Sequence, residues 1–264
     1  MRLISPRNPS PHRPLFVYLP GMDGSGELLH LQIPHLQPTF DIRCLTLPKH
    51  DDFSSWFELA SHTINAIQTE LIDRANRTVY LCGESFGGCL ALQVMLQAPQ
   101  LVDRLILVNP ASSFKQRPWM TWGTPLIRWF PESFYQLSAI GLLPYLASWE
   151  RVSQDAQQKL LKAMQSVSPA TASWRLSLLR VFAATTAQLR QIDRPTLVIA
   201  SQNDRLLPSI SEAQNLARTL PKARSIILPQ SGHACLLEHQ VNLYQILQEA
   251  RFLSEVEAMV MGNG

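Results

Sequence analysis

Three side chains that could work together in nucleophilic catalysis follow three separate apolar segments of the chain. Ser85 lies in the turn 83–87, Asp204 follows the segment 195–200, and His233 follows the segment 224–228. A serine hydroxyl becomes an effective nucleophile when a base accepts its proton, and that base needs a third group to fix its tautomer and stabilise its charge. The three residue types therefore predict a catalytic triad of Ser85, His233 and Asp204.

The turn at Ser85 reads G-E-S-F-G over residues 83–87. Residues 78–82 have the apolar, partly β-branched composition of a buried strand, whereas residues 90–96 have that of a buried helix. A serine on such a sharp turn needs small neighbours two positions away on each side, because the helix crosses close to the strand. The helix start also directs free N–H groups at negative charge, so we expect the Phe86 N–H to stabilise an oxyanion. The alternative is a glycine-rich turn whose serine has no function.

A second glycine-rich turn, residues 20–26, follows the apolar segment 15–19 and contains three glycines. In sheets that carry a serine turn of this kind, the loop after the equivalent strand donates the second oxyanion N–H. By position we assign that N–H to Met22. Taken alone, the loop is equally compatible with a plain turn that leads into a helix over residues 28–36.

The other acids and histidines fit a triad less well. Asp193 precedes its strand and belongs at the opposite edge of the sheet, and Asp103 stands at a strand start. His239 lies inside or near a helix, and the remaining histidines lie in the early half of the chain. Asp204 and His233 both follow late strands, which places them at the same edge as Ser85.

Apolar segments alternate with helical ones along most of the chain. We expect strands over residues 15–19, 40–47, 78–82, 103–108, 195–200 and 224–228. We expect helices over 28–36, 53–75, 85–96 and 242–260, the second capped by Ser54 or Ser55. Continuous apolar strands joined by helices predict an α/β fold with a mostly parallel central sheet that has helices on both faces. Ligands bind such sheets at the carboxyl ends of the strands, where Ser85, Met22 and Asn109 fall.

Residues 112–187 interrupt this alternation, and they contain five of the six tryptophans. Helical periodicity over 156–164 and 176–182 predicts a helical cap inserted into a core formed by residues 1–111 and 188–264. The aromatic side chains of this cap could line an apolar acyl pocket or contact a membrane interface. The alternative is that they pack the cap onto the core.

The cap is also the basic part of the chain. Between residues 112 and 190 there are nine Lys or Arg against three acids, although the whole chain carries a net charge of only +3. This excess predicts attraction to an acidic acyl-carrier protein or to an anionic membrane surface, with four arginines (Arg128, Arg151, Arg175 and Arg180) as contacts. The alternative is a solvated helical surface that happens to be basic.

Length and composition limit the remaining possibilities. A chain of 264 residues with 46% hydrophobic content suits one large α/β domain with an insertion, not a disordered protein. Four cysteines without C-x-x-C spacing suggest buried thiols in a reducing compartment and no metal site. The first 14 residues resemble no secretory signal, and no apolar run is long enough to span a membrane. We therefore expect a cytoplasmic protein, peripheral to a membrane at most, with no cofactor and no nucleic-acid partner.

Five motifs carry a resemblance to a known family. The chain resembles the α/β-hydrolase superfamily from residue 15 to 253, and it is most similar to the hydrolase half of phytyl ester synthases and diacylglycerol acyltransferase-like proteins. The motifs are L-P-G-M-D-G-S-G (19–26), G-E-S-F-G-G (83–88), V-N-P-A-S-S-F (108–114), A-S-Q-N-D-R-L-L-P-S (200–209) and S-G-H-A-C-L-L-E (231–238). The resemblance implies a hydrophobic acyl or isoprenyl ester substrate. The chain departs from the family in having no His-x-x-x-x-Asp acyltransferase motif.

These observations predict a serine hydrolase that cleaves carboxylic esters of hydrophobic substrates through an acyl-enzyme. Within the same fold, one alternative is an esterase for carrier-linked acyl methyl esters, of the pimeloyl-carrier type. Another is an acyltransferase that passes the acyl group from Ser85 to an alcohol while excluding water. A non-catalytic protein that holds a lipid or hormone-like ligand in the pocket is the alternative from a different class.

Overall fold

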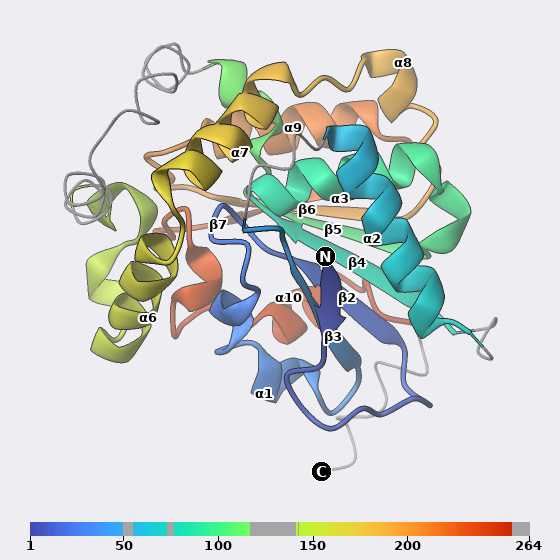
Figure 1. Cartoon of the computed structure of the whole chain (residues 1–264), viewed down its shortest axis with the longest axis horizontal. Helices are drawn as coiled ribbons and strands as arrows, with labels where there is room; N and C mark the ends of the chain where they lie inside the picture. Colours follow the sequence, from blue (N-terminus) through green and yellow to red (C-terminus); the bar gives the residue numbers. More distant parts are fainter. Residues whose placement is uncertain (50–54, 73–76, 117–140, 142, 255–264) are drawn as a thin grey trace.

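In a computed structural model of the chain, seven strands form one sheet in the order β1-β3-β2-β4-β5-β6-β7 (Figure 1). The structure describes residues 1–49, 55–72, 77–116, 141 and 143–254. Neighbouring strands are parallel except β1, which pairs antiparallel with β3 at one edge. The strands are β1 (Arg2–Ile4), β2 (Leu15–Leu19), β3 (Asp41–Thr46), β4 (Val79–Glu84), β5 (Arg104–Val108), β6 (Thr196–Ser201) and β7 (Ala223–Leu228).

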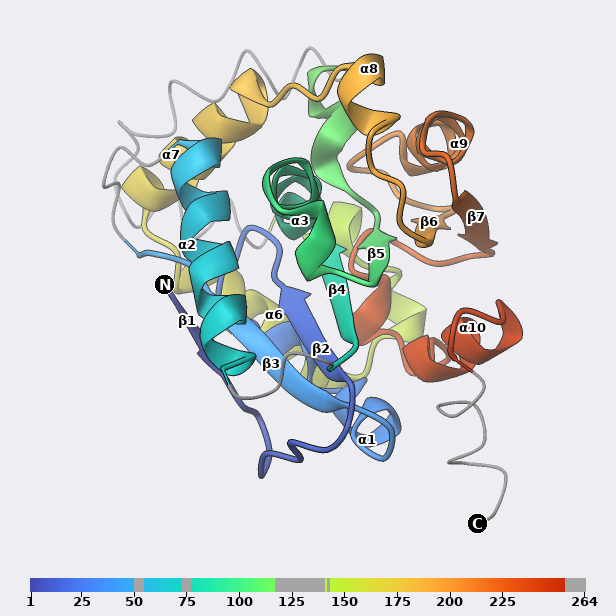
Figure 2. The ribbon, with the colours of Figure 1, turned by 90° about the vertical axis from the view of Figure 1, so that its right-hand side faces the viewer.

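Both faces of the sheet are covered, which explains why the central strands are apolar along most of their length. In β2, Leu15, Val17 and Leu19 belong to one core cluster, whereas Phe16 and Tyr18 belong to another, because successive side chains point to opposite faces. The first cluster includes side chains of α2 (Trp56–Glu70), α3 (Phe86–Gln97), α7 (Pro169–Val181) and α9 (Ser209–Thr219). The second includes side chains of α1 (Ile33–Leu36) and α10 (Leu243–Glu249), which lie below the sheet in Figure 2. The expected α/β architecture is confirmed.

Helix α2 begins where the sequence indicates. Ser55 caps it and accepts a hydrogen bond from the Glu58 backbone N–H, while the Glu58 carboxylate accepts one from the Ser55 N–H. This reciprocal capping box satisfies two of the backbone donors that a helix start leaves unpaired. Of the two serines considered, Ser55 is therefore the cap.

The expected helix over residues 28–36 is wrong as a continuous element. The chain instead forms a 3₁₀ turn, Glu27–Leu29, and a single α-helical turn, α1. The cause is Pro34, which has no N–H to donate and is tolerated only in the first turn of a helix, where α1 places it.

The expected helix over residues 242–260 ends early. Asn242 caps α10, but Arg251 then takes a left-handed conformation with φ of 48°. The Phe252 N–H bonds back to the Leu247 carbonyl at 2.8 Å, the bond that closes a Schellman motif. Phe252 is then buried on the core, and residues 255–260 lie outside the described part of the chain.

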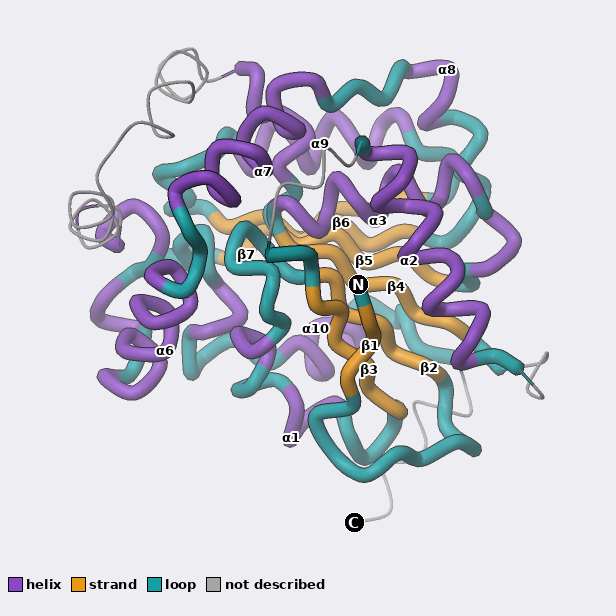
Figure 3. The backbone as a smooth tube through the Cα atoms, in the orientation of Figure 1, coloured by secondary structure: helices purple, strands orange, loops and turns teal. Residues whose placement is uncertain are grey.

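The segment between β5 and β6 is the predicted cap. Its described elements are the 3₁₀ helices Ala111–Gln116 and Trp149–Arg151, and the helices α6 (Gln154–Gln165), α7 and α8 (Thr186–Leu189), shown with the sheet in Figure 3. Of its tryptophans, Trp174 is buried in the core cluster that contains α2 and α3. Trp119, Trp122 and Trp129 lie outside the described residues. The division into a core and a cap at residues 112 and 187 stays a prediction.

Candidate active site

Ser85 stands at the junction of β4 and α3 in a conformation that few residues adopt. Its backbone angles are φ 52° and ψ −111°, a region whose occupation costs on the order of 1–3 kcal/mol. Backbone bonds hold it there: the Ser85 N–H donates to the Val108 carbonyl at 3.0 Å, and the Ser85 carbonyl accepts the Ala111 N–H at 3.0 Å. The end of β5 therefore fixes the turn that carries the hydroxyl.

The glycines around Ser85 are required by close backbone approach. A Cβ placed on Gly83 would lie 2.3 Å from the carbonyl oxygen of Gly87, and one placed on Gly87 would lie 2.0 Å from that of Leu19. Real carbon atoms do not approach backbone oxygen so closely. Strand β2, strand β4 and helix α3 meet here without side chains between them, as the spacing of the glycines predicts.

His233 connects Ser85 to Asp204. Its Nε2 lies 2.9 Å from the Ser85 Oγ, and its Nδ1 lies 2.7 Å from the Asp204 Oδ2. The side chains of His233 and Asp204 are only 6% and 1% exposed. The structure thus brings together the three residues that the sequence singles out, with His233 between Ser85 and Asp204.

The Asp204 carboxylate has several partners besides His233. Its Oδ1 accepts the backbone N–H groups of Leu206 and Leu207 at 2.8 and 2.9 Å, and its Oδ2 also accepts the Ser209 hydroxyl. Burial acts to raise the pKa of Asp204, but His233 and these donors stabilise the charged form and hold the pKa below its usual value. Asp204 is therefore ionised at neutral pH and can stabilise an imidazolium.

The surroundings of the His233 ring raise its pKa. Burial acts to lower its pKa, but the negative charge and hydrogen bond of Asp204, with a smaller contribution from Glu84, raise the pKa above its ordinary value. A base with a raised pKa accepts the serine proton more readily. The same shift means that His233 is protonated, and unable to act as a base, over a wider acidic range.

Asn109 is a buried residue that supports His233, and the sequence indicates its place at the sheet edge but not its contacts. Its Nδ2 donates to the His233 carbonyl at 2.7 Å and to the Ser201 Oγ at 2.9 Å, while its Oδ1 accepts the Ser201 N–H at 2.8 Å. These bonds join the ends of β5 and β6 to the histidine loop. Asn109 thereby fixes the backbone from which the His233 ring extends.

Glu84 and Tyr18 form a buried pair beside Ser85 that the sequence analysis does not identify. The Tyr18 hydroxyl donates to the Glu84 carboxylate across the pairing of β2 and β4. Burial raises the pKa of Glu84 to about 7, although the Tyr18 hydrogen bond and the charge of His233 oppose this. The signal available in the sequence was an acidic residue inside an otherwise apolar strand.

The loop 20–26 lies against Ser85 from the side of β2. A Cβ placed on Gly21 would lie 3.7 Å from the Ser85 Cβ. Phe86 is the first residue of α3, so its N–H has no partner within the helix. Gly21 and Phe86 therefore lie on either side of Ser85, and the assignment of the Met22 and Phe86 N–H groups as oxyanion donors stays a prediction.

Comparison with known proteins places this geometry in a family. The family profile described as "Serine aminopeptidase, S33" matches residues 48–240, most of the chain. The chain belongs to this family of α/β-hydrolases. The match covers Ser85, Asp204 and His233, whereas Met22 lies before it.

Among curated relatives of this hydrolase, "Phytyl ester synthase 1, chloroplastic" from Arabidopsis thaliana is 30% identical over 262 residues, covering 89% of this chain. The chain spans only 36% of that protein's length. A "Pimeloyl-[acyl-carrier protein] methyl ester esterase" from Nitrosomonas europaea is 27% identical over 213 residues, covering 78% of this chain and 82% of the relative. Both relatives are named for ester chemistry, one as a synthase and the other as an esterase.

Solved structures with the same fold include an esterase from Exiguobacterium antarcticum, with a TM-score of 0.76 and 18% sequence identity. The superposition covers 96% of this chain and 94% of that one. MenH from S. aureus superposes with a TM-score of 0.74, also at 18% identity, over 95% and 98% of the two chains. At this level of identity the likeness shows the fold alone.

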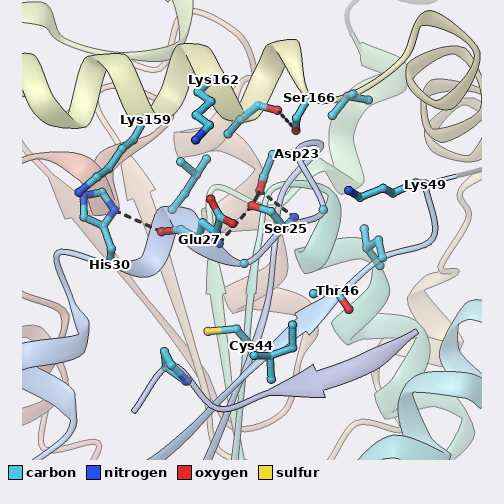
Figure 4. A pocket seen from close by; sticks show the side chains of 18 of the residues that line it. Asp23, Ser25, Glu27, His30, Cys44, Thr46, Lys49, Lys159, Lys162 and Ser166 are labelled. Atoms are coloured by element: carbon cyan, nitrogen blue, oxygen red, sulfur yellow. Dashed lines mark hydrogen bonds between the residues drawn. The ribbon is translucent and has the colours of Figure 1, made fainter.

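A cavity of about 830 Å³ lies beside the loop 20–26, between β3 and α6 (Figure 4). Asp23, Ser25 and Glu27 line one side, and Lys159 and Lys162 of α6 lie across from them. Ser85 and His233 are not part of its described lining. The described lining therefore combines acidic and basic side chains, and it lies apart from the immediate surroundings of the serine.

The described residues contain neither a metal-binding cluster nor a membrane-spanning helix. Within them, no cluster of three or more His, Cys, Asp and Glu side chains could hold a metal ion. No helix in the same part of the chain has the length and hydrophobicity needed to cross a bilayer.

Two of the four arginines expected to contact an acidic partner are engaged elsewhere. Arg175 is 2% exposed, and Arg151 pairs with the buried carboxylate of Glu238 at 2.7 Å. Arg180 is exposed, and Arg128 lies outside the described residues. The expectation that Arg175 lies on a docking surface is wrong, because its guanidinium is enclosed by the protein.

Proposed function

We propose that the chain is a serine hydrolase that cleaves carboxylic esters of hydrophobic acyl substrates through an acyl-enzyme. The observation that carries the proposal is the pair of distances at His233, 2.9 Å to the Ser85 Oγ and 2.7 Å to the Asp204 Oδ2. A base with one nitrogen on the nucleophile and the other on a buried acid is the arrangement that activates a serine hydroxyl.

In the first half-reaction, the Ser85 Oγ attacks the ester carbonyl carbon while its proton moves to the His233 Nε2. Asp204 stabilises the resulting imidazolium. The backbone N–H groups of Met22 and Phe86 donate to the oxyanion, each contributing roughly 3 kcal/mol to transition-state stabilisation. The bond to the alkoxy oxygen then breaks, and the leaving alcohol takes the proton from His233.

In the second half-reaction, water attacks the acyl-Ser85 ester and gives a proton to His233. The bond between the acyl carbon and the Ser85 Oγ breaks, and the proton returns from His233 to the serine oxygen. The carboxylic acid leaves and the enzyme is restored. An acceptor alcohol in place of water would give acyl transfer by the same steps, which is why an acyltransferase remains an alternative.

A hydrophobic acyl or isoprenyl substrate is supported by the similarity to phytyl ester synthases. Four buried cysteines, all present as free thiols, support a reducing compartment, and a cytoplasmic location is part of the proposal. Peripheral contact with an anionic membrane at the basic surface of the cap is also part of the proposal, since Lys159 and Lys162 are exposed there.

The test is hydrolysis of a p-nitrophenyl ester series from acetate to palmitate, with Ser85→Ala as the control. We expect turnover that increases toward long acyl chains and disappears in Ser85→Ala. Covalent labelling of Ser85 by a fluorophosphonate probe should accompany it. A Ser85→Ala protein with full activity would refute the mechanism, and an unlabelled Ser85 would favour a non-catalytic lipid-binding protein.

A second candidate function is an esterase for carrier-linked acyl methyl esters. Two observations favour it: the chain matches most of the length of the pimeloyl-carrier esterase, and three exposed lysines surround the cavity beside the loop 20–26. These are Lys49, Lys159 and Lys162. A basic surface attracts an acidic carrier protein and accelerates its association.

The carrier hypothesis is tested by comparing a carrier-linked methyl ester with the free methyl ester at 20 and 300 mM salt. Carrier docking predicts a loss of kcat/KM at high salt for the linked ester only, and a similar loss in a Lys159→Ala, Lys162→Ala double variant. Arg180→Ala and Arg151→Ala, measured in the same way, show whether either of these cap arginines contributes to carrier docking. Equal salt responses of the two esters would exclude docking through charge.

A further inference from the structure

We propose that Arg175 is a positioning residue that holds the oxyanion loop in its active conformation from the cap helix α7. This inference rests on the proposed function, because it concerns the loop that carries the Met22 N–H. Arg175 is the largest fully buried side chain of the described residues, and it is charged. Buried charges are costly unless hydrogen bonds satisfy them.

The Arg175 guanidinium donates hydrogen bonds to two backbone carbonyls of the described residues. Its Nη1 donates to the Met22 carbonyl, and its Nη2 donates to the Pro48 carbonyl at 2.7 Å. A planar guanidinium with fixed donor directions can hold two carbonyls at once, which a lysine cannot do with the same geometry. Arg175 thereby ties the loop after β2 to the loop after β3.

The contact with Met22 bears directly on the proposed oxyanion hole. The Met22 carbonyl and the Met22 N–H belong to adjacent peptide planes of one residue, so fixing the carbonyl restricts the rotation of both planes. The contribution of an oxyanion donor depends on its being aimed correctly before the reaction begins. A loop that is free to rotate would present the N–H in the correct direction only part of the time.

Gly24 shows that the loop and the guanidinium are fitted to each other. Gly24 has φ of 65°, and a Cβ built on it would lie 2.6 Å from the Arg175 Nη2. The Gly24 carbonyl in turn accepts the Leu47 N–H at 2.8 Å. The loop therefore lies directly on the guanidinium, and a side chain at position 24 would displace it.

Helix α7 provides a rigid base for Arg175. The neighbouring Trp174 and the later Leu178 and Leu179 are buried in the core cluster that also contains Phe86. The Leu178 carbonyl accepts the indole N–H of Trp56 from α2 at 2.7 Å. The guanidinium is therefore attached through α7 to the main core of the sheet, and it can act as a fixed clamp on the loop.

The test compares Arg175→Met with Arg175→Lys and with the matched control Arg180→Met, which changes an exposed arginine on the same helix. With a p-nitrophenyl ester, we expect Arg175→Met to lower kcat by roughly 100-fold with KM changed less than threefold, because a misplaced catalytic group costs about that factor. Arg175→Lys should recover part of the rate, and Arg180→Met should match the wild type. The pH at half-maximal kcat/KM should stay unchanged, since His233 and Asp204 are untouched.

Two further measurements distinguish a positioning role of Arg175 from a purely structural one. We expect millimolar guanidinium to restore part of the kcat of Arg175→Ala, because the ion can occupy the vacated site, and to have no such effect on Arg180→Met. A second variant, Gly24→Ala, should reproduce the kcat loss by displacing the guanidinium. The inference is overturned if folded Arg175→Met keeps kcat within threefold of wild type, or if its loss is neither rescued by guanidinium nor eased by lysine. An active Ser85→Ala, measured in parallel, would refute the proposed function instead.

Discussion

The substitution Glu84→Gln should remove a pH dependence of stability that the wild-type chain carries. Burial raises the pKa of Glu84 to about 7 from an unfolded value of 4.5. A carboxyl with a raised pKa binds more protons in the folded state than in the unfolded state between these two values. Stability from this group is therefore complete below pH 4.5 and is lost as the pH rises toward 7.

The magnitude follows from the size of the shift. Each pKa unit corresponds to about 1.4 kcal/mol, so the full transition amounts to roughly 3 kcal/mol, of which about 2.5 kcal/mol falls between pH 5 and 8. Glutamine has nearly the same shape, keeps a carbonyl for the Tyr18 hydroxyl, and is neutral throughout. The variant should therefore lack this part of the slope. Loss of the Glu84 charge also lowers the pKa of His233, which reduces the slope further in the same direction.

The assay is equilibrium urea unfolding of wild type and Glu84→Gln at pH 5 and pH 8, at constant ionic strength. The wild type should lose about 2.5 kcal/mol more than the variant between the two conditions. Other titrating groups, such as the buried Glu212, contribute equally to both proteins and cancel. Glu249→Gln, at an exposed position, should keep the wild-type slope. Equal losses in wild type and Glu84→Gln would refute the reasoning.

Three further predictions concern the triad and its turn. Asp204→Asn should lower kcat by about 10⁴-fold because the imidazolium loses its stabilising charge, and a steady-state rate within tenfold of wild type would contradict this. The kcat/KM of the wild type should fall as the pH drops through a value above 6.5, because His233 must be neutral to accept a proton. In Glu84→Gln this limb should move to lower pH, and an unmoved limb would show that Glu84 does not act on His233. Gly87→Ala should abolish cooperative thermal unfolding, since its Cβ would lie 2.0 Å from the Leu19 oxygen, and a wild-type melting temperature would contradict the steric argument.

The sheet and the triad geometry follow from the sequence because they depend on local patterns. Each central strand is a continuous apolar segment, and the carboxyl ends of parallel strands meet at one edge. Ser85, Asp204 and His233 each follow such a segment closely, so their meeting is a consequence of topology. The edge strand β1 and the helix α9 were not anticipated. β1 has only three residues and pairs antiparallel, so it carries no apolar run that periodicity could detect.

The sequence does not show which side chains from distant segments come into contact. Tyr18 and Glu84 lie 66 positions apart, and their pairing depends on which face of β2 and β4 each side chain occupies. Asn109 likewise bonds to groups 92 and 124 positions away. Arg175 is the clearest case. A long side chain on an amphipathic helix usually extends its charge into water, and only the tertiary fold shows carbonyls enclosing it.

The segment between β5 and β6 contacts the loop 20–26 and the loop that carries His233. The cap segment therefore supports the loops around Ser85 in addition to covering them. On one side, Arg175 holds the Met22 carbonyl. On the other side, Ala234, which directly follows His233 in the chain, donates its N–H to the Leu146 carbonyl at 2.7 Å.

The histidine side of this arrangement includes a buried acid. The Glu238 carboxylate accepts the Gly232 N–H at 2.7 Å and pairs with Arg151 at the same distance. A Cβ placed on Gly232 would lie 2.9 Å from the Ser148 nitrogen, so the cap segment lies directly on the histidine loop. Substitutions in this segment that are intended to change substrate preference should therefore also change kcat whenever they disturb Arg175 or Arg151. Variants confined to exposed cap positions such as Arg180 should leave kcat unchanged.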